Sequence, residues 1–300
     1  MADSGPGGAS VADEPGASPT KFARDTAVWR EAGPDRAGTG QQLVFGAKVA
    51  PDWRAGRGPH GGYLAAMLLR ALIESVADDT RAPRSLTIHY TRAPEPGPVR
   101  ISTVLERQGR SLSTLSARMH QDGEPIALVL AAFSVPWGGP ELSDVQMPKV
   151  DPPDRSREGV RLIEHGGPEF ARHIVLQPRM QGRLFAGGEQ PMEIRGWLGL
   201  AEPRPIDALS LALFSDALIP APYMRLGEPV AVPTIDLTVH FRARMPREAE
   251  PDPAELCLAM TRTELIHDGF FVEDGTIWAA DGTLLAQSRQ LAIVIPFAKQ

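Results

Sequence analysis

Two adjacent glycines, Gly61 and Gly62, stand directly before an apolar run that extends from Tyr63 to Leu72. The run is too long for an ordinary strand and predicts a helix, so the glycines would lie at its N-terminus. Three interpretations are open: a tight turn before a core helix, a phosphate-binding loop, or a place where helix N–H groups meet an anion or a developing oxyanion. The phosphate loop is disfavoured because no Lys-Ser/Thr pair follows these glycines. The remaining choice depends on what the rest of the chain brings to this helix start.

The composition excludes several classes of protein. A chain of 300 residues with 42% hydrophobic content can bury one large core or two ordinary ones. Its net charge of −6 offers no basic surface for nucleic acid, and the single Cys257 allows neither an intrachain disulfide nor a cysteine zinc cluster. No N-terminal stretch resembles a signal peptide, and no uncharged run reaches membrane-spanning length. We therefore expect a cytoplasmic protein without nucleic-acid or membrane partners.

Two stretches of biased composition suggest how the chain is divided. Residues 1–26 are rich in Gly, Ala, Ser and Pro, which predicts a flexible tail. Residues 138–168 combine prolines and charges without periodicity, which predicts a linker. The boundaries leave an N-terminal unit, residues 27–137, and a C-terminal unit, residues 169–300.

The two units contain an internal repeat. The segment SLTIHYTR, Ser85–Arg92, matches DLTVHFRA, Asp236–Ala243, and apolar residues alternate with period two in both, so each predicts a half-buried strand. An apolar helix precedes each strand and two hairpins follow it, which predicts two similar α+β units whose sheets join and wrap their helices. The hairpin turns are expected near Gly109 and Gly123 in the first copy and near Gly269 and Gly282 in the second.

The order of these elements resembles the hotdog fold, and the double copy resembles the acyl-CoA thioesterase II family. The resemblance extends from about Trp29 to Pro296 and depends on GGYLAAMLLRAL, SLTIHYTRAPEPGPV, RQGRSLST, LFSDALIP, PTIDLTVHFR and DGTLLAQSRQLAI in this order. It implies an α+β tandem hotdog with two antiparallel sheets, each wrapping a long helix. It also implies a hydrolase of fatty acid metabolism that converts an acyl-CoA thioester to a free acid and CoA, with no cofactor and no metal.

The same resemblance implies three catalytic residues in the second copy. The family holds the attacking water with an Asp on the helix, a Thr before the following strand and a Gln on the last strand. The matching residues here are Asp216 in FSDALIP, Thr234 in PTIDLTVHF and Gln290 in QSRQLAI. Each also fits an ordinary role, as a solvated carboxylate, a strand's first residue and an exposed sheet residue. Their neighbours Asp236 and Gln287 are alternative candidates.

The repeat provides a separate check on this assignment. Its alignment matches three residues of the first copy with the three candidates, and none of these three could act as the corresponding acid-base, hydroxyl or amide group. This difference favours one catalytic cleft, whose polar groups come from the second copy. The matched pairs are Arg70 with Asp216, Pro83 with Thr234, and Ala131 with Gln290.

The glycines at the helix start acquire a role through this resemblance. In hotdog enzymes the cleft lies between two units, so the backbone N–H groups of Gly61, Gly62 and Tyr63 would face the carbonyl attacked near the catalytic Asp and receive the oxyanion charge. Arg107 and Arg110, in the turn RQGR, could contact the phosphates of CoA, although a charged hairpin turn is the simpler interpretation.

Other residue patterns leave few competing enzymes. His60 fits a turn residue better than a ligand, while His89 and His240 occupy matched positions of the repeat, which favours a structural role over metal binding. The second-copy helix lacks the His expected of hotdog hydratases and dehydratases. Two non-enzymatic alternatives are a non-catalytic acyl-CoA-binding protein and a scaffold. The expected partners are the acyl-CoA substrate and further copies of the chain, in a homo-oligomer of double-hotdog units.

Overall fold

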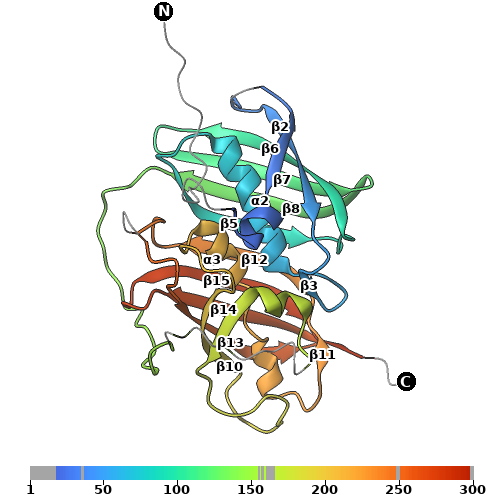
Figure 1. The fold of residues 1–300 in the computed structure, drawn as a ribbon, viewed down its shortest axis with the longest axis vertical. Coiled ribbons are helices and arrows are strands. Elements are labelled where there is room, and N and C mark those ends of the chain that lie inside the picture. Colours follow the sequence, from blue (N-terminus) through green and yellow to red (C-terminus); the bar gives the residue numbers. More distant parts are fainter. Residues whose placement is uncertain are drawn as a thin grey trace, which may run out of the picture.

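The computed structural model of the protein describes residues 18–34, 37–154, 156, 159, 166–247 and 251–297. Within these residues, twelve strands form one continuous antiparallel sheet. Two helices that contact each other, α2 (Gly61–Val76) and α3 (Ala208–Phe214), pack against this sheet (Figure 1). The α+β class is confirmed. The predicted joining of the two units' sheets is confirmed, because strands from the two copies pair directly. The result is one continuous sheet, so the prediction of two antiparallel sheets is corrected.

The strand order shows where the two copies meet. The first six strands across the sheet come from the N-terminal half and the other six from the C-terminal half. In order, they are β1 (Val28–Ala32), β2 (Gln42–Val49), β6 (Gly97–Gln108), β7 (Leu112–Gln121), β8 (Glu124–Ser134), β5 (Ala82–Tyr90), β12 (Thr234–Phe241), β15 (Leu284–Ile293), β14 (Phe270–Trp278), β13 (Cys257–His267), β10 (Glu193–Leu200) and β9 (Ile174–Pro178). Shorter elements are the strand pairs β3 (Arg54–Ala55) with β4 (Gly58–Pro59) and β11 (Val230–Ala231) with β16 (Ile295–Pro296), and the 3₁₀-helices η2 (Glu169–His173) and η3 (Ala221–Met224).

A local twofold axis between β5 and β12 relates the two copies of the repeat. Thr87 and Thr238 occupy the same position of the repeated SLT and DLT motifs, 151 residues apart. In the structure they are direct partners across the antiparallel strands, with 3.1 Å between their hydroxyl oxygens. A residue that pairs with its own repeat equivalent must lie on the axis that relates the copies. The axis therefore passes through this strand pair.

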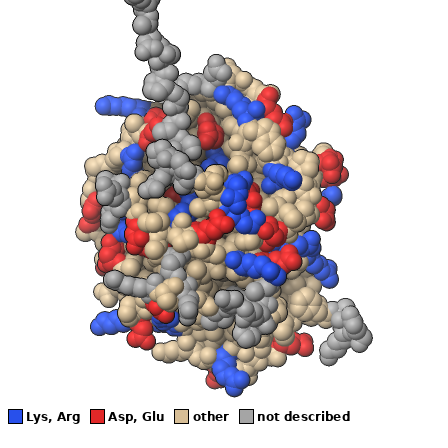
Figure 2. Space-filling model, in the orientation of Figure 1, with Lys and Arg blue, Asp and Glu red and all other residues tan. Residues whose placement is uncertain are grey.

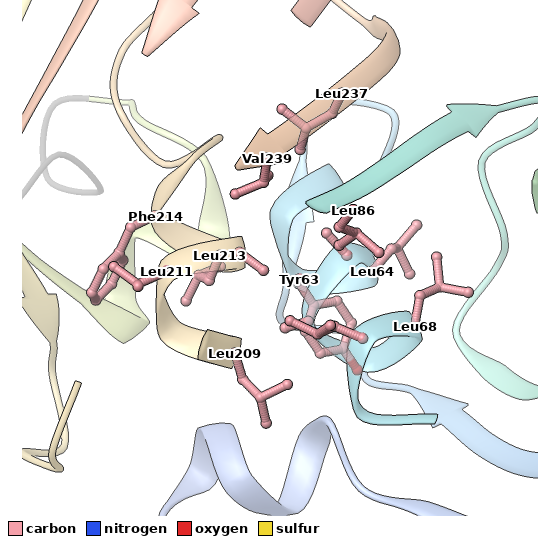
Figure 3. Packing of buried hydrophobic residues seen from close by; sticks show 14 of the residues in the cluster. Tyr63, Leu64, Leu68, Leu86, Leu209, Leu211, Leu213, Phe214, Leu237 and Val239 are labelled. Atoms are coloured by element: carbon pink, nitrogen blue, oxygen red, sulfur yellow. The ribbon is translucent and has the colours of Figure 1, made fainter. Parts of the chain in front are cut away.

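Helix α2 is the central element of the core. It is 16 residues long, and most of its side chains are buried against the sheet and α3. The helix ends at Ala77, which adopts a left-handed conformation with φ 46°. In Figure 3, Leu213 of α3 lies between the two helices, and Leu86 and Val239 extend toward them from β5 and β12. The apolar run after the glycines thus forms a buried helix, as its length predicted.

The second helix is much shorter than the first. Asp207 caps its start by accepting a hydrogen bond from the Ser210 N–H at 2.7 Å. The helix has seven residues, and at its end the Ser215 hydroxyl donates to the main-chain oxygen of Leu211. Pro220 follows closely and could not continue the hydrogen-bond ladder. The prediction of a long helix in the second copy is therefore wrong.

The predicted hairpin turns are confirmed. Gly123, Gly269 and Gly282 all have positive φ, at 84°, 78° and 90°. Asp122 and Asp268, which precede the first two of these glycines, also have positive φ. Consecutive positive φ values are those of the tight turns that match the twist of paired strands, and Asp-Gly is the favoured sequence for them. The predicted turn near Gly109 likewise connects β6 to β7.

The predicted tail extends too far into the folded protein. Helix α1 (Lys21–Asp25) follows the cap Thr20, and its Phe22 is only 3% exposed. Phe22 packs against Trp53, whose indole N–H donates to the carboxylate of Asp25. The aromatic side chain lets this short polar segment bury apolar surface, which composition alone did not reveal. The flexible tail remains a prediction for residues 1–17, which lie outside the described residues.

The predicted linker covers the sheet face away from α2 and α3. Residues 138–154 form neither helix nor strand, as predicted, but Met147 and Val150 pack on the cluster that contains Trp197 and Trp278. The Trp197 indole N–H donates to the main-chain oxygen of Asp151 at 2.9 Å. Part of the remaining linker lies outside the described residues. This segment therefore packs on the second half of the sheet as well as connecting the two copies.

Figure 2 shows acidic and basic side chains intermixed over the face in view. Among the helices that the structure describes, none combines the length and the apolar character needed to cross a membrane. Within the same residues, no three His, Cys, Asp or Glu side chains form a group that could hold a metal ion.

Candidate active site

His60 begins helix α2 and caps its first turn. Its Nδ1 accepts a hydrogen bond from the Tyr63 N–H at 3.2 Å, so in the neutral ring the proton is assigned to Nε2. Nε2 lies 2.8 Å from the main-chain oxygen of Asp216 and donates to it. The ring is 2% exposed and stacks on Phe170, with 4.0 Å between ring centroids. His60 therefore connects the start of α2 to the chain that follows α3.

Asp216 lies at the N-terminus of α2. It follows Ser215, the C-cap of α3, so it lies just beyond the helix on which it was predicted. Its Oδ2 accepts a hydrogen bond from the Gly62 N–H at 2.9 Å, and its side chain is 13% exposed. The first N–H groups of a helix have no partners within the helix and carry partial positive charge, so they stabilise a carboxylate. The structure thus joins the glycine motif of the first copy to the predicted base of the second.

The glycine pair permits this close approach. A Cβ atom on Gly61 would lie 2.9 Å from Asp216 Oδ2, and one on Gly62 would lie 2.5 Å from the main-chain oxygen of Leu213. Both distances are shorter than carbon–oxygen contacts in folded proteins. Positions 61 and 62 therefore need residues without side chains, because α3 and Asp216 pack directly on the start of α2.

We expect Gly62→Ala to destabilise the protein by about 1–3 kcal/mol, the range of overpacked sites, although alanine is the better helix former. The added methyl group would meet a main-chain oxygen, which cannot move without shifting α3. Gly227→Ala is the matched control, because nothing lies within 4 Å of its Cβ position, and we expect it to stay within about 0.5 kcal/mol of the parent. Denaturant unfolding measures both; equal stability of the two variants would contradict the tight approach.

Thr234 and Gln290 come together in a chain of hydrogen bonds. The Thr234 hydroxyl donates to Gln290 Oε1 at 2.9 Å. The Gln290 amide donates through Nε2 to Glu273 Oε1 at 3.0 Å, and Glu273 Oε2 accepts from the Ala221 N–H at 2.7 Å. The chain joins strands β12, β15 and β14 to the 3₁₀-helix η3. Two residues that the sequence predicted separately are thus direct partners.

Glu273 connects this chain electrostatically to Asp216. The carboxyl group is only 4% exposed, and burial is the main reason that its pKa is raised to about 7. The hydrogen bonds from Ala221 and Gln290 lower the pKa, whereas the negative charge of Asp216 raises it. The charge of Asp216 therefore acts on the carboxyl group that holds Gln290.

Tyr90 adds a further polar contact at the start of α2. Its hydroxyl donates to the main-chain oxygen of Gly61 at 2.9 Å. Burial raises the pKa of Tyr90 well above its ordinary value, and the negative charge of Asp216 adds to the shift. The hydroxyl therefore remains a hydrogen-bond donor at neutral pH and holds the glycine backbone in place.

The predicted N–H donors are not equivalent in the structure. The Gly62 N–H binds Asp216, while the Tyr63 N–H binds His60. The Tyr63 hydroxyl donates to the main-chain oxygen of Asp25, so this side chain serves the packing of α1. The prediction that Tyr63 offers its N–H to an oxyanion is at odds with these contacts, because capping of the helix already uses that group.

The two arginines predicted to contact CoA lie far from Asp216. Arg107 and Arg110 are exposed in and beside the turn between β6 and β7. Arg81, which follows α2, donates to the main-chain oxygens of Gly109 and Arg110, so the turn adjoins the C-terminal end of α2. Asp216 adjoins the N-terminal end, and a helix of 16 residues is about 24 Å long. The structure does not bring these arginines to the candidate site.

Sequence reasoning missed Glu273 and Tyr90 and gave His60 too small a role. Glu273 occupies a core-facing position of the alternating strand FFVEDGTIW, between the buried Phe271 and Ile277. An acidic residue at such a position is the signal that could have identified it. Tyr90 continues the apolar alternation of its strand, and nothing local indicates that its hydroxyl reaches a glycine 29 residues away.

Comparison with known proteins shows the family. Residues 49–134 match the acyl-CoA thioesterase N-terminal domain, and residues 145–294 match the acyl-CoA thioesterase C-terminal domain. The chain belongs to the acyl-CoA thioesterase family, which confirms the resemblance found in its motifs. The order of the two matches also agrees with a chain built from two related units.

Individual relatives confirm the hotdog fold. Human acyl-coenzyme A thioesterase 8 is 29% identical over 160 residues, which are 52% of this chain and 47% of the human protein. The chain thus spans about half the length of that relative. A hotdog-fold protein of unknown function from Alicyclobacillus acidocaldarius is 24% identical, with a TM-score of 0.79 over 94% of this chain and 100% of that chain. A candidate thioesterase II from Thermobifida fusca is 26% identical, with a TM-score of 0.72 over 92% of this chain and 97% of that chain.

Proposed function

We propose that this protein hydrolyses acyl-CoA thioesters to a free acid and CoA by means of a water molecule that Asp216 activates. Membership of the acyl-CoA thioesterase family supports thioester hydrolysis in general. The observation that carries the assignment of this site is the hydrogen bond of Asp216 to the start of α2, together with the Thr234–Gln290 hydrogen bond and the effect of the Asp216 charge on Glu273. In this proposal the carboxylate, the hydroxyl and the amide come from one copy and the helix N-terminus from the other.

Each group has a distinct part in the proposed reaction. The Thr234 hydroxyl donates a hydrogen bond to Gln290, so the lone pairs of the hydroxyl oxygen can accept a hydrogen bond from one hydrogen of a water molecule. Asp216 accepts the other hydrogen as the general base. The resulting hydroxide attacks the thioester carbonyl carbon, and the tetrahedral intermediate then breaks its C–S bond. The CoA thiolate leaves with the bonding electron pair and takes up the proton that Asp216 accepted from water, which returns Asp216 to its ionised form.

The oxyanion of this intermediate belongs at the first turn of α2. Gly61 and Gly62 carry N–H groups that the helix cannot pair internally. The Gly62 N–H, which binds Asp216 Oδ2, would pass to the thioester oxygen when substrate enters. This exchange would leave Asp216 Oδ2 with a lone pair for the water at the moment when the base is needed.

We expect the purified protein to release free thiol from at least one member of an acyl-CoA panel after exhaustive chelation. The proposed groups are a carboxylate, a hydroxyl and an amide, and the thiolate of a thioester leaves readily, so the mechanism needs no Lewis acid. A thiol-release assay with short, medium, long, branched and aromatic acyl-CoAs, with acyl-carrier-protein thioesters alongside, makes the test. Activity restored only by a divalent cation would contradict the mechanism.

The same assay distinguishes the alternative function. Tight binding of acyl-CoA without turnover of any panel member would favour a non-catalytic acyl-CoA-binding protein or scaffold. A part in fatty acid metabolism, a cytoplasmic location and a homo-oligomer of double-hotdog units stay predictions, and light scattering over a dilution series tests the last of them.

A further inference from the structure

Glu273 is a carboxylate inside the core of the second copy. Its strand β14 alternates between the two faces of the sheet, and Phe271 and Ile277, on the same face as Glu273, are 3% and 2% exposed. Burial of an ionisable group is unfavourable unless its hydrogen bonds are satisfied. A protein that needed only a stable core at this position would place an apolar residue there.

The first copy does place an apolar residue there. In the second copy, Glu273 pairs across the sheet with Gln290 on one side and with Thr263 on the other. In the first copy, the repeat equivalent of Gln290 is Ala131, and its partner on the neighbouring strand is Leu115. Leu115 pairs in turn with Leu105, and a register shift directly follows Leu105 just as one follows Thr263. The strand registers thus make Leu115 the counterpart of Glu273. The three paired residues of the second copy, Thr263, Glu273 and Gln290, are polar, whereas their first-copy counterparts are apolar.

The hydrogen bonds of Glu273 determine which group donates and which accepts in the series of hydrogen bonds from Glu273 through Gln290 to Thr234. An ionised carboxylate only accepts, so Gln290 must turn its NH₂ group toward Glu273 and its oxygen toward Thr234. The Thr234 hydroxyl must then donate to Gln290, which leaves its oxygen lone pairs for another donor. The Ala221 N–H holds the second carboxylate oxygen in place. An apolar residue at position 273 would leave the amide free to adopt either orientation.

We propose that Glu273 is a positioning residue of the hydrolytic site. Its carboxylate holds the Gln290 amide so that the amide oxygen faces Thr234 and accepts a hydrogen bond from its hydroxyl. The inference rests on the proposed thioester hydrolysis, because it assigns the polarity of the groups that would hold the water. Glu273 itself contacts Gln290 and Ala221 and acts on the reaction through them. It explains why a buried acid stands where the first copy has Leu115.

This role makes the rate of hydrolysis depend on pH. The groups that face Glu273 are Thr263 from β13, Gln290 from β15, the Ala221 N–H from η3 and the charge of Asp216 beyond α3. Burial and Asp216 oppose ionisation, and the pKa of Glu273 is about 7. A protonated carboxyl can donate as well as accept, so it holds the amide less strictly. Activity should therefore rise as pH increases through about 7, where Glu273 loses its proton.

The test compares Glu273→Gln and Glu273→Leu with a matched control. Asp274→Asn removes an acidic group from the next position of β14, on the opposite face of the sheet, where Asp274 is exposed and pairs with Arg289. We expect both Glu273 variants to lose about tenfold in kcat with a much smaller change in KM, because they misplace groups that act in the transition state. They should also lose the step near pH 7, whereas Asp274→Asn should match the parent protein. Glu273→Leu leaves the Ala221 N–H and the Gln290 amide without their acceptor, which destabilises the folded state. Circular dichroism therefore has to verify that this variant is folded before its kcat is compared.

A second measurement does not depend on turnover. The side-chain amide resonance of Gln290, identified by its loss in Gln290→Ala, should titrate near pH 7 in the parent and in Asp274→Asn but not in Glu273→Leu. If the parent hydrolyses thioesters while both Glu273 variants keep its kcat and pH profile, the positioning role is overturned and the proposed function stands. If the parent hydrolyses none of the panel, the proposed function fails; an amide titration that Glu273→Leu leaves unchanged would then overturn the positioning role as well.

Discussion

Replacement of Asp216 by asparagine is expected to lower kcat for acyl-CoA hydrolysis by about a hundredfold or more, the loss typical of a removed general base. Asparagine has nearly the same size, and its amide oxygen can still accept the Gly62 N–H, so the packing of α2 against the chain after α3 should persist. It cannot take a proton from water at neutral pH. KM should change much less, because the base acts in the transition state rather than in binding.

Asp236→Asn is the matched control for this variant. It removes the same charge from β12, where Leu237 and Val239 face the core and Asp236, adjacent to Leu237, faces the opposite side of the sheet. Its kcat should stay near that of the parent protein. Steady-state hydrolysis of the best acyl-CoA, with circular dichroism to verify folding, measures both variants. A fully active Asp216→Asn variant would show that another residue is the base. An inactive Asp236→Asn variant would favour Asp236, the alternative candidate from the sequence.

Gln290→Ala is expected to lower kcat by about tenfold to a hundredfold, the range for groups that position the reacting atoms. The change removes both the acceptor of the Thr234 hydroxyl proton and the donor to Glu273. Thr234 could then donate its proton to the water instead of accepting from it, and the water would lose its orientation. The expected signature is a loss in kcat at nearly constant KM.

Gln287→Ala is the matched control for the amide. Gln287 lies three residues earlier on β15, on the opposite face of the sheet, where its amide oxygen accepts from Arg242 at 2.8 Å in an exposed pair. We expect its kcat to remain near that of the parent. If Gln287→Ala is as damaging as Gln290→Ala, the effect comes from strand stability rather than from the water site. Thermal unfolding of the two variants separates these outcomes.

Much of the fold follows from local sequence patterns. The period-two alternation in SLTIHYTR and DLTVHFRA predicted strands, and both are strands. The Asp-Gly pairs at Gly123 and Gly269 predicted tight turns because only small or turn-forming residues adopt positive φ readily. The apolar run after Gly62 predicted a helix, which extends over Gly61–Val76. These predictions succeed because each depends on interactions between residues that are close in the chain.

Features that depend on distant contacts could not be predicted from the sequence, and contact of Arg107 and Arg110 with CoA stays a prediction. Phe22 orders a segment that composition alone marks as flexible, because it finds Trp53 to pack against. The turn with Arg107 and Arg110 lies at the far end of α2 from Asp216, which no sequence spacing indicates. Arg70, the repeat counterpart of Asp216, donates to Thr26 in the chain after α1, so the first-copy equivalent of the base has become part of a packing contact.

The sequence by itself showed glycines before a helix in the first copy. Its resemblance to the acyl-CoA thioesterase II family then implied which residues could carry the chemistry, an acid, a hydroxyl and an amide in the second copy. Both depend on motifs and on the repeat, which require no knowledge of distances. The tertiary structure decided that Asp216 binds the Gly62 N–H, that Gln290 links Thr234 to Glu273, and that His60 joins the two copies. Such contacts form across the local twofold or between strands that are far apart in the chain. Hydrogen bonds act only within about 3 Å and within a narrow range of directions, so only the packed fold could specify them.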